Sequence, residues 1–175
     1  MLNKIINLLS VYKRKFKYKK NSYSFNGVDL IIEYIFKNKN TGFYLDIGAQ
    51  HPISNNNTYL LYKKGWRGIN IDLDQKNIDL FNLVRPNETN LNCAVSNVEG
   101  ETDLFFYHDS SPINTLNKEV SNFQNAKVKE IKKIKTKTLD NILYSLNFDK
   151  QIDYMNIDVE GYEEKILDGF NLRKY

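Results

Sequence analysis

The chain contains the stretch Gly42-Phe-Tyr-Leu-Asp-Ile-Gly-Ala-Gln-His-Pro52, and Gly68-Ile-Asn-Ile-Asp72 follows it downstream. Both segments are short and apolar, which is typical of buried strands in an α/β sheet. In an open parallel sheet, ligands bind across the carboxyl ends of the strands. We therefore expect a ligand cleft with Gly48 at the end of one strand and Asp72 at the end of the next.

The residue types at these two strand ends fit a nucleoside cofactor. A glycine at position 48 allows close approach of the backbone to a ligand, and the next helix can present its N–H groups to a carboxylate or phosphate. A carboxylate at Asp72 can accept hydrogen bonds from both hydroxyls of a ribose. Alone, Gly48 could be a turn glycine and Asp72 a solvated strand end, but their order and spacing favour the cofactor.

A longer series of motifs resembles one protein family. The motifs are Asp46-Ile-Gly-Ala-Gln-His-Pro52, Asn57-Thr-Tyr-Leu-Leu-Tyr-Lys-Lys-Gly-Trp-Arg-Gly-Ile-Asn-Ile-Asp72, Arg85-Pro86, Cys93-Ala-Val-Ser96 and Ile157-Asp-Val-Glu-Gly161. In order and spacing, over about residues 41–170, they resemble the FkbM-like methyltransferases. The resemblance implies an S-adenosylmethionine-dependent enzyme, usually an O-methyltransferase of sugars or other hydroxylated small molecules. It also implies a Rossmann-like class I methyltransferase fold, an α/β fold with a parallel sheet flanked by helices.

The same resemblance implies roles for individual residues. Asp46, Gly48 and Ala49 would form the loop at the methionine end of the cofactor, and Asp72 would bind the ribose. The family's adenine wall would fall on Asn92, Cys93 and Ala94.

The glycine loop also bears on the choice between S-adenosylmethionine and NAD. Gln50, His51 and Pro52 stand where a dinucleotide fingerprint would have its later glycines. Pyrophosphate needs close approach of the backbone at that turn, and a histidine and a proline obstruct it. This difference favours S-adenosylmethionine.

Composition predicts one domain with an N-terminal extension. The chain has 175 residues, 41% of them hydrophobic, and neither a Gly/Ser-rich linker nor an internal repeat. We expect a basic amphipathic segment over residues 1–24 and a methyltransferase domain over residues 25–175. The single cysteine, Cys93, cannot form an internal disulfide, which favours a reducing, cytoplasmic location.

Basic residues form two runs in a chain whose net charge is +4. One run is Lys13, Arg14, Lys15, Lys17, Lys19 and Lys20, and the other is Lys127, Lys129, Lys132, Lys133, Lys135 and Lys137. Such runs bind nucleic acid or anionic lipid in some proteins and are solvated faces in most. The apolar residues among the second run indicate an amphipathic segment with its cationic side outward. The N-terminal run follows a short amphipathic helix that could lie on a membrane, the domain or a partner, but is too polar to span a bilayer.

The rest of the chain alternates between helical and extended patterns. We expect strands at residues 43–47, 68–72, 90–95 and 152–159, and an extra strand at residues 101–107. Helices should begin near Val28, after an N-cap at Asn57-Thr58, near Ile78, after an N-cap at Thr138, and after Gly161. This alternation requires a parallel sheet with right-handed crossovers.

The resemblance implies further strands beyond the last helix, whereas this chain stops at Tyr175. We therefore expect a C-terminally incomplete fold, in which the strand at residues 152–159 lies beside the strand at residues 43–47 with its far edge unpaired. Such an edge invites pairing with another chain, including a second copy of this one.

Asp158 and Glu160 leave the fourth strand, and His51 leaves the first. Side chains alternate along a strand, so Asp158 and Glu160 should point to the same side. They could serve as general base and sugar ligand, could together bind a divalent cation, or could merely form a turn and a helix cap. His51 is a further candidate base, although a histidine before proline is as often a structural loop residue.

The sequence therefore predicts an S-adenosylmethionine-dependent O-methyltransferase that acts on a hydroxyl of a sugar, glycan or other small molecule. Two alternatives stay open. One is an RNA methyltransferase guided by the basic runs, whose RNA binding would depend steeply on salt. The other is a non-catalytic module that binds S-adenosylmethionine or a partner.

Overall fold

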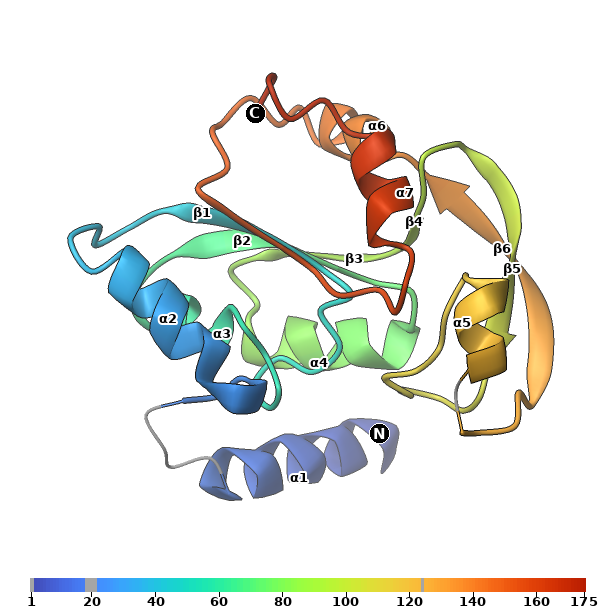
Figure 1. Ribbon diagram of the computed structural model, residues 1–175. Coiled ribbons are helices and arrows are strands. Elements are labelled where there is room, and N and C mark those ends of the chain that lie inside the picture. Colours follow the sequence, from blue (N-terminus) through green and yellow to red (C-terminus); the bar gives the residue numbers. More distant parts are fainter. Residues whose placement is uncertain (1, 18–21, 124) are drawn as a thin grey trace.

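A four-stranded parallel sheet forms the centre of the molecule. The computed structural model describes residues 2–17, 22–123 and 125–175 (Figure 1). The strands lie in the order β3-β2-β1-β7, with bounds Thr89–Asn92, Arg67–Asp72, Phe43–Ile47 and Tyr154–Ile157. Every neighbouring pair is parallel. The predicted α/β fold is therefore confirmed.

Helices cover both faces of this sheet (Figure 1). After the short 3-10 turn η1 (Phe25–Gly27), one face carries α2 (Val28–Ile35), α3 (Tyr59–Lys63) and α4 (Gln75–Val84). The other face carries α6 (Leu139–Ser145) and α7 (Glu163–Asp168). All five correspond to helices that the sequence predicts. The Thr138 side chain accepts a hydrogen bond from the N–H of Asn141 at 3.2 Å, so the predicted cap of α6 is confirmed.

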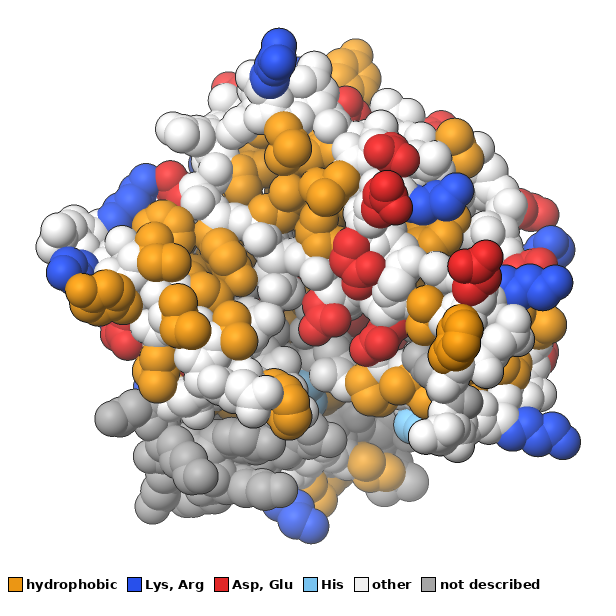
Figure 2. All heavy atoms as spheres, viewed as in Figure 1, with side chains coloured by type: hydrophobic (Ala, Val, Ile, Leu, Met, Phe, Trp, Pro, Cys, Tyr) orange, Lys and Arg blue, Asp and Glu red, His pale blue; other side chains and the backbone are white. Residues whose placement is uncertain are grey.

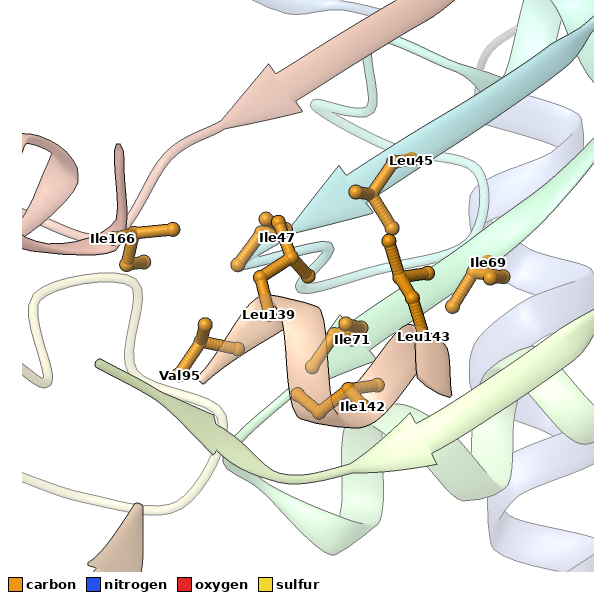
Figure 3. Packing of buried hydrophobic residues seen from close by; sticks show 9 residues of the cluster. All are labelled: Leu45, Ile47, Ile69, Ile71, Val95, Leu139, Ile142, Leu143 and Ile166. Carbon is orange, nitrogen blue, oxygen red and sulfur yellow. The ribbon is translucent and has the colours of Figure 1, made fainter. Parts of the chain in front are cut away.

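The main core lies between the sheet and α6. Alternate residues of a strand point to one face, so the apolar residues of β1 and β2 divide between the two faces. On the α6 face, Figure 3 shows the cluster Leu45, Ile47, Ile69, Ile71, Val95, Leu139, Ile142, Leu143 and Ile166. On the other face, Tyr44 packs in a smaller cluster with Ile32, Leu61 and Trp66. Burial on both faces holds the carboxyl ends of the strands in place.

A second, three-stranded sheet extends beyond β3. Its order is β4-β6-β5, with bounds Ala94–Val95, Glu130–Lys137 and Gly100–Phe106. The prediction of one strand over residues 90–95 is wrong, because Cys93 interrupts it and separates β3 from β4. There the Cys93 N–H donates to the Asp72 carbonyl at 3.0 Å, and β4 then pairs with β6. The predicted extra strand is confirmed as β5, and α5 (Lys118–Phe123) lies between β5 and β6 in the sequence.

The second lysine run falls largely on β6. Lys133, Lys135 and Lys137 are exposed, and Lys133 pairs with Asp103 of β5 at 2.6 Å. The predicted amphipathic segment is thus a strand with an outward cationic side, but Ile131, which is 57% exposed, lies on that side with the lysines.

Strand β7 lies at the edge of the main sheet. It pairs with β1 and, within the described ranges, with no second strand, as predicted. It is shorter than the predicted residues 152–159. The final residues turn back toward its start, where the Ile152 N–H donates to the Tyr175 carbonyl at 3.0 Å. Phe170, Leu172 and Tyr175 border a hollow beside β7.

The N-terminal segment forms the helix α1 (Leu2–Lys17), which lies beside α4 (Figure 1). Of the first basic run, Lys19 and Lys20 lie outside the described residues, as do the side chains of Arg14, Lys15 and Lys17. Among the helices that the structure describes, none is long and apolar enough to cross a membrane. Contact of α1 with a membrane surface stays a prediction, as does the division at residue 24.

Candidate active site

An open cleft lies at the carboxyl ends of β1, β2 and β7. Its empty volume is about 750 Å³, which includes open solvent at the mouth. Six residues that the sequence singled out line it together, although they come from four separate segments: Gly48, Asp72, Cys93, Ala94, Asp158 and Glu160. Asp46, Ala49, His51 and Asn92 are not among the lining residues.

Gly48 brings the end of β1 against the end of β7. Its φ is +76°, and a Cβ on it would lie 1.9 Å from the carbonyl oxygen of Asp158. Glycine is therefore required here by the close approach of the protein's own backbone. The N–H groups of Gly48 and Ala49 both donate to the Ile71 carbonyl, at 2.9 and 3.1 Å. The expected presentation of a helix N-terminus to the ligand is wrong, since α3 begins only at Tyr59 and does not line the cleft.

Asp46 ties the loop after β1 to both neighbouring segments. Its buried carboxylate accepts hydrogen bonds from Thr58 Oγ1 at 2.7 Å, Asn56 Nδ2 at 3.3 Å and Asn156 Nδ2 at 2.9 Å. The Thr58 side chain makes no cap hydrogen bond to α3, and its backbone is helical (φ −106°, ψ −12°) where a cap residue is normally extended, so the predicted cap of α3 is wrong. Asp46 thus positions the loop and β7 from behind the cleft.

Asp72 is buried and held by three donors. Its carboxylate accepts from the N–H groups of Gln50 and Asp74, both at 2.8 Å, and from Asn77 Nδ2 at 3.1 Å. Burial raises the pKa of Asp72, and these hydrogen bonds oppose that rise. The carboxylate therefore has a fixed orientation at the cleft wall, as a ligand for a ribose requires.

Asp158 and Glu160 reach the cleft from a tight turn. Strand β7 ends at Ile157, before both residues. The prediction that they point to the same side because side chains alternate along a strand is therefore wrong. Glu160 has φ of +56° and Gly161 has φ of +88°, which reverses the chain. The Glu163 carboxylate accepts from the N–H groups of Val159 and Gly161, both at 3.2 Å, and fixes this turn.

Carboxylates crowd around this turn. Burial raises the pKa of Asp158, and the negative charges of Asp46 and Glu163 raise it further. Burial likewise raises the pKa of Glu160, with contributions from Asp158 and Glu163. Figure 2 shows Asp and Glu side chains gathered from α7 down to this turn. Both groups are therefore better proton acceptors than exposed carboxylates.

Three further predicted site residues, Ala49, His51 and Asn92, do not line the cleft. His51 is buried, and its Nδ1 accepts from the N–H groups of Ile53 and Ser54, both at 3.1 Å, so it shapes the loop. The carbonyl of buried Ala49 accepts from Asn56 at 3.2 Å. Asn92 donates to the carbonyl of Asp72 at 3.1 Å. These contacts support the walls of the cleft.

Sequence reasoning missed one wall of the cleft. Ser111, Pro112, Asn114 and Leu116 line it from the segment between β5 and α5, and Tyr162 lines it from the turn before α7. The only signal in the sequence was the polar loop His108-Asp-Ser-Ser-Pro112 after the extra strand. Nothing local links that loop to the ends of β2 and β7.

The charged residues among the described lining are all acidic, and the lining includes no lysine, arginine or histidine. Asp72, Asp74, Asp158 and Glu160 supply four carboxylates. In the ranges covered by the structure, no group of three or more His, Cys, Asp or Glu side chains could hold a metal ion. The negative charge of the cleft therefore favours a ligand that is cationic or neutral.

Comparison with protein families identifies the class of protein. The profile of the methyltransferase FkbM domain matches residues 46–175, so the chain belongs to the FkbM methyltransferase family. The match begins at Asp46 and takes in the strand-end residues described above. Searches of curated proteins and of solved structures find no significant match. The resemblance that the motifs predict is confirmed.

Proposed function

We propose that the chain is an S-adenosylmethionine-dependent O-methyltransferase that acts on a hydroxyl of a sugar, glycan or other small molecule. The observation that carries the proposal is the acidic cleft, which joins Gly48, Asp72, Asp158 and Glu160 at the carboxyl ends of three parallel strands. Family membership supports methyl transfer in general, and the composition of the cleft supports the choice of donor and acceptor.

The charge of the cleft fits S-adenosylmethionine. Its sulfonium and ammonium groups outweigh its single carboxylate, so it carries a net positive charge into a cleft lined by four acidic residues. The pyrophosphate of NAD would be repelled there. Asp72 would accept hydrogen bonds from the ribose, and the apolar side chains of Ile71 and Val95 would contact the base. When bound, the donor supplies an electrophilic methyl group.

Asp158 and Glu160 would prepare the acceptor. An alcohol is a weak nucleophile until a base removes its proton, and a base works best when its pKa approaches the working pH. The pKa values of Asp158 and Glu160 are both raised, which is the direction that favours a general base. One carboxylate would take the hydroxyl proton while the other binds a neighbouring hydroxyl and orients the acceptor.

The acidic cleft argues against RNA as the acceptor. RNA-binding sites carry lysine and arginine beside the reacting group, and the described lining has neither. The exposed lysines of β6 do not line the cleft.

The test is methyl transfer from radiolabelled S-adenosylmethionine to a panel of sugars, glycans and hydroxylated small molecules, with an RNA pool as the competing acceptor. We expect label on a hydroxylated small molecule. Asp158→Asn and Glu160→Gln should each lower turnover and leave the affinity for S-adenosylhomocysteine unchanged, whereas Glu164→Gln, on the exposed side of α7, should retain full turnover. Binding of the donor with no transfer to any acceptor would instead support the non-catalytic alternative.

A further inference from the structure

Residues 108–117 lie between β5 and α5 in the sequence. They cross the cleft and are here called the strap. On the β2 side, the N–H of Ser110 donates to the Asp74 carboxylate, and Asp109 pairs with Lys76. On the β7 side, Thr115 Oγ1 donates to the Glu160 carbonyl at 2.8 Å, and Asn117 Nδ2 donates to the Gly161 carbonyl at 2.6 Å. The strap is therefore fastened to both walls of the cleft.

Hydrogen bonds within and next to the strap fix its conformation. Asn114 accepts from the N–H of Tyr107 at 2.9 Å and donates to the carbonyl of His108 at 3.0 Å. The N–H of Ser111 donates to the same carbonyl at 3.2 Å. These bonds fix the backbone of the strap, so a side chain that it presents to the cleft has a defined position.

Ser111 is the exception in this well-bonded segment. Its residue is 7% exposed and lines the cleft, and its Oγ is buried without a hydrogen-bond partner among the described residues. A buried hydroxyl without a partner destabilises a protein, and native structures contain few of them. A bound ligand would supply the missing partner. Because Ser111 follows Ser110, which bonds to Asp74, it lies on the side of the cleft that carries Asp72.

We propose that Ser111 is a ligand-binding residue whose Oγ hydrogen-bonds to the nucleoside part of the methyl donor. This inference rests on the proposed function, since it takes S-adenosylmethionine as the occupant of the cleft. The strap then completes the site as a further wall, between Asp74 and the turn at Glu160 and Gly161.

The experiment is isothermal calorimetry of the full chain and of Ser111→Ala, titrated with S-adenosylhomocysteine and, separately, with adenosine. We expect Ser111→Ala to weaken both ligands by about 3- to 10-fold, the loss of one hydrogen bond. Ser110→Ala is the matched control, because that serine neighbours Ser111 and does not line the cleft, and it should bind like the unchanged chain. Without ligand, the melting temperature of Ser111→Ala should equal or exceed that of the unchanged chain, because no protein hydrogen bond is lost.

Each outcome decides a separate point. Equal affinity of Ser111→Ala and the unchanged chain overturns the proposal and leaves the proposed function standing. A loss for S-adenosylhomocysteine but not for adenosine contradicts the nucleoside assignment. A lowered melting temperature would assign Ser111 to the folding of the strap. If the unchanged chain binds neither ligand, the proposed function itself fails.

Discussion

At the scale of single residues, Asp72 links the fold to the ligand. Its carboxylate fixes the loop after β1 through Gln50 and the start of α4 through Asp74, and it also lines the cleft. One side chain therefore joins two cleft walls, and under the proposed function it accepts hydrogen bonds from the ribose of the methyl donor.

We expect Asp72→Ala to weaken the binding of S-adenosylhomocysteine by about 1.5–3 kcal/mol, the value of charge-assisted hydrogen bonds. The same change leaves the N–H groups of Gln50 and Asp74 without their acceptor, so the melting temperature should fall as well. Asp79→Ala, on the exposed face of α4, is the control and should change neither quantity. Calorimetry together with thermal unfolding separates the two effects. Unchanged affinity would remove Asp72 from the site.

The carboxylate cluster predicts a pH dependence. The pKa values of Asp158 and Glu160 are raised, so turnover should fall on the acid side at a higher pH than exposed carboxylates would give. Glu163→Gln removes a charge that raises both pKa values and keeps an oxygen to accept from Val159 and Gly161. The acid limb of the turnover profile should therefore move to lower pH.

Glu164→Gln is the control for this pH profile, because Glu164 is an exposed neighbour on α7 and does not contribute to either raised pKa. Its acid limb should coincide with that of the unchanged chain. An acid limb that stays in place in Glu163→Gln would contradict the assignment of the base to this cluster.

Much of the cleft lining could be predicted from residue types at strand ends. Gly48, Asp72, Asp158 and Glu160 follow strands whose carboxyl ends meet, so their convergence follows from a parallel sheet. Ser111 could not be found in this way, because its place depends on contacts between the strap and segments distant in sequence. The roles assigned to these residues stay predictions.

At the scale of elements, the contact between β1 and β7 depends on a glycine. We expect Gly48→Ala to destabilise the fold far more than Gly65→Ala, a matched position with φ of +100° and open space around it. Gly65→Ala should cost about 1–2 kcal/mol for its backbone conformation alone. Gly48→Ala adds the collision with the Asp158 carbonyl, about 1–3 kcal/mol or more.

Chemical denaturation of the two variants measures this difference in the free energy of unfolding. Equal losses would show that the β1–β7 approach is loose in solution.

The elements themselves were predicted unevenly. Strand β1 was predicted at its observed bounds, because its apolar run is bracketed by polar residues and glycine. The split between β3 and β4 was not, since it arises when β4 leaves β2 and pairs with β6, far along the chain. Local patterns thus locate strands and leave their nonlocal partners open.

At the scale of the whole molecule, the edge of β7, which no strand of the described residues pairs, predicts self-association. Figure 2 shows hydrophobic side chains between β7 and the C-terminal segment and over α2, on the same face as the acidic cleft. Unpaired strand edges beside apolar surface promote pairing between chains.

We expect the chain to associate with rising concentration in sedimentation velocity, and Leu172→Lys, beside β7, to weaken this association. Val98→Lys is the matched control, because Val98 is 60% exposed and Leu172 is 61% exposed, but Val98 does not border the hollow beside β7. A monomer at all concentrations, or equal effects of the two changes, would contradict a role for this edge.

The central claim is that the acidic cleft at the ends of β1, β2 and β7 binds S-adenosylmethionine. The most direct measurement is calorimetric titration of the folded chain with S-adenosylmethionine and, in parallel, with NAD. We expect saturable one-to-one binding of S-adenosylmethionine and no heat of binding for NAD, because four carboxylates line the cleft and no cationic side chain among the described residues offsets them. Binding of NAD by a folded chain that ignores S-adenosylmethionine would contradict the account.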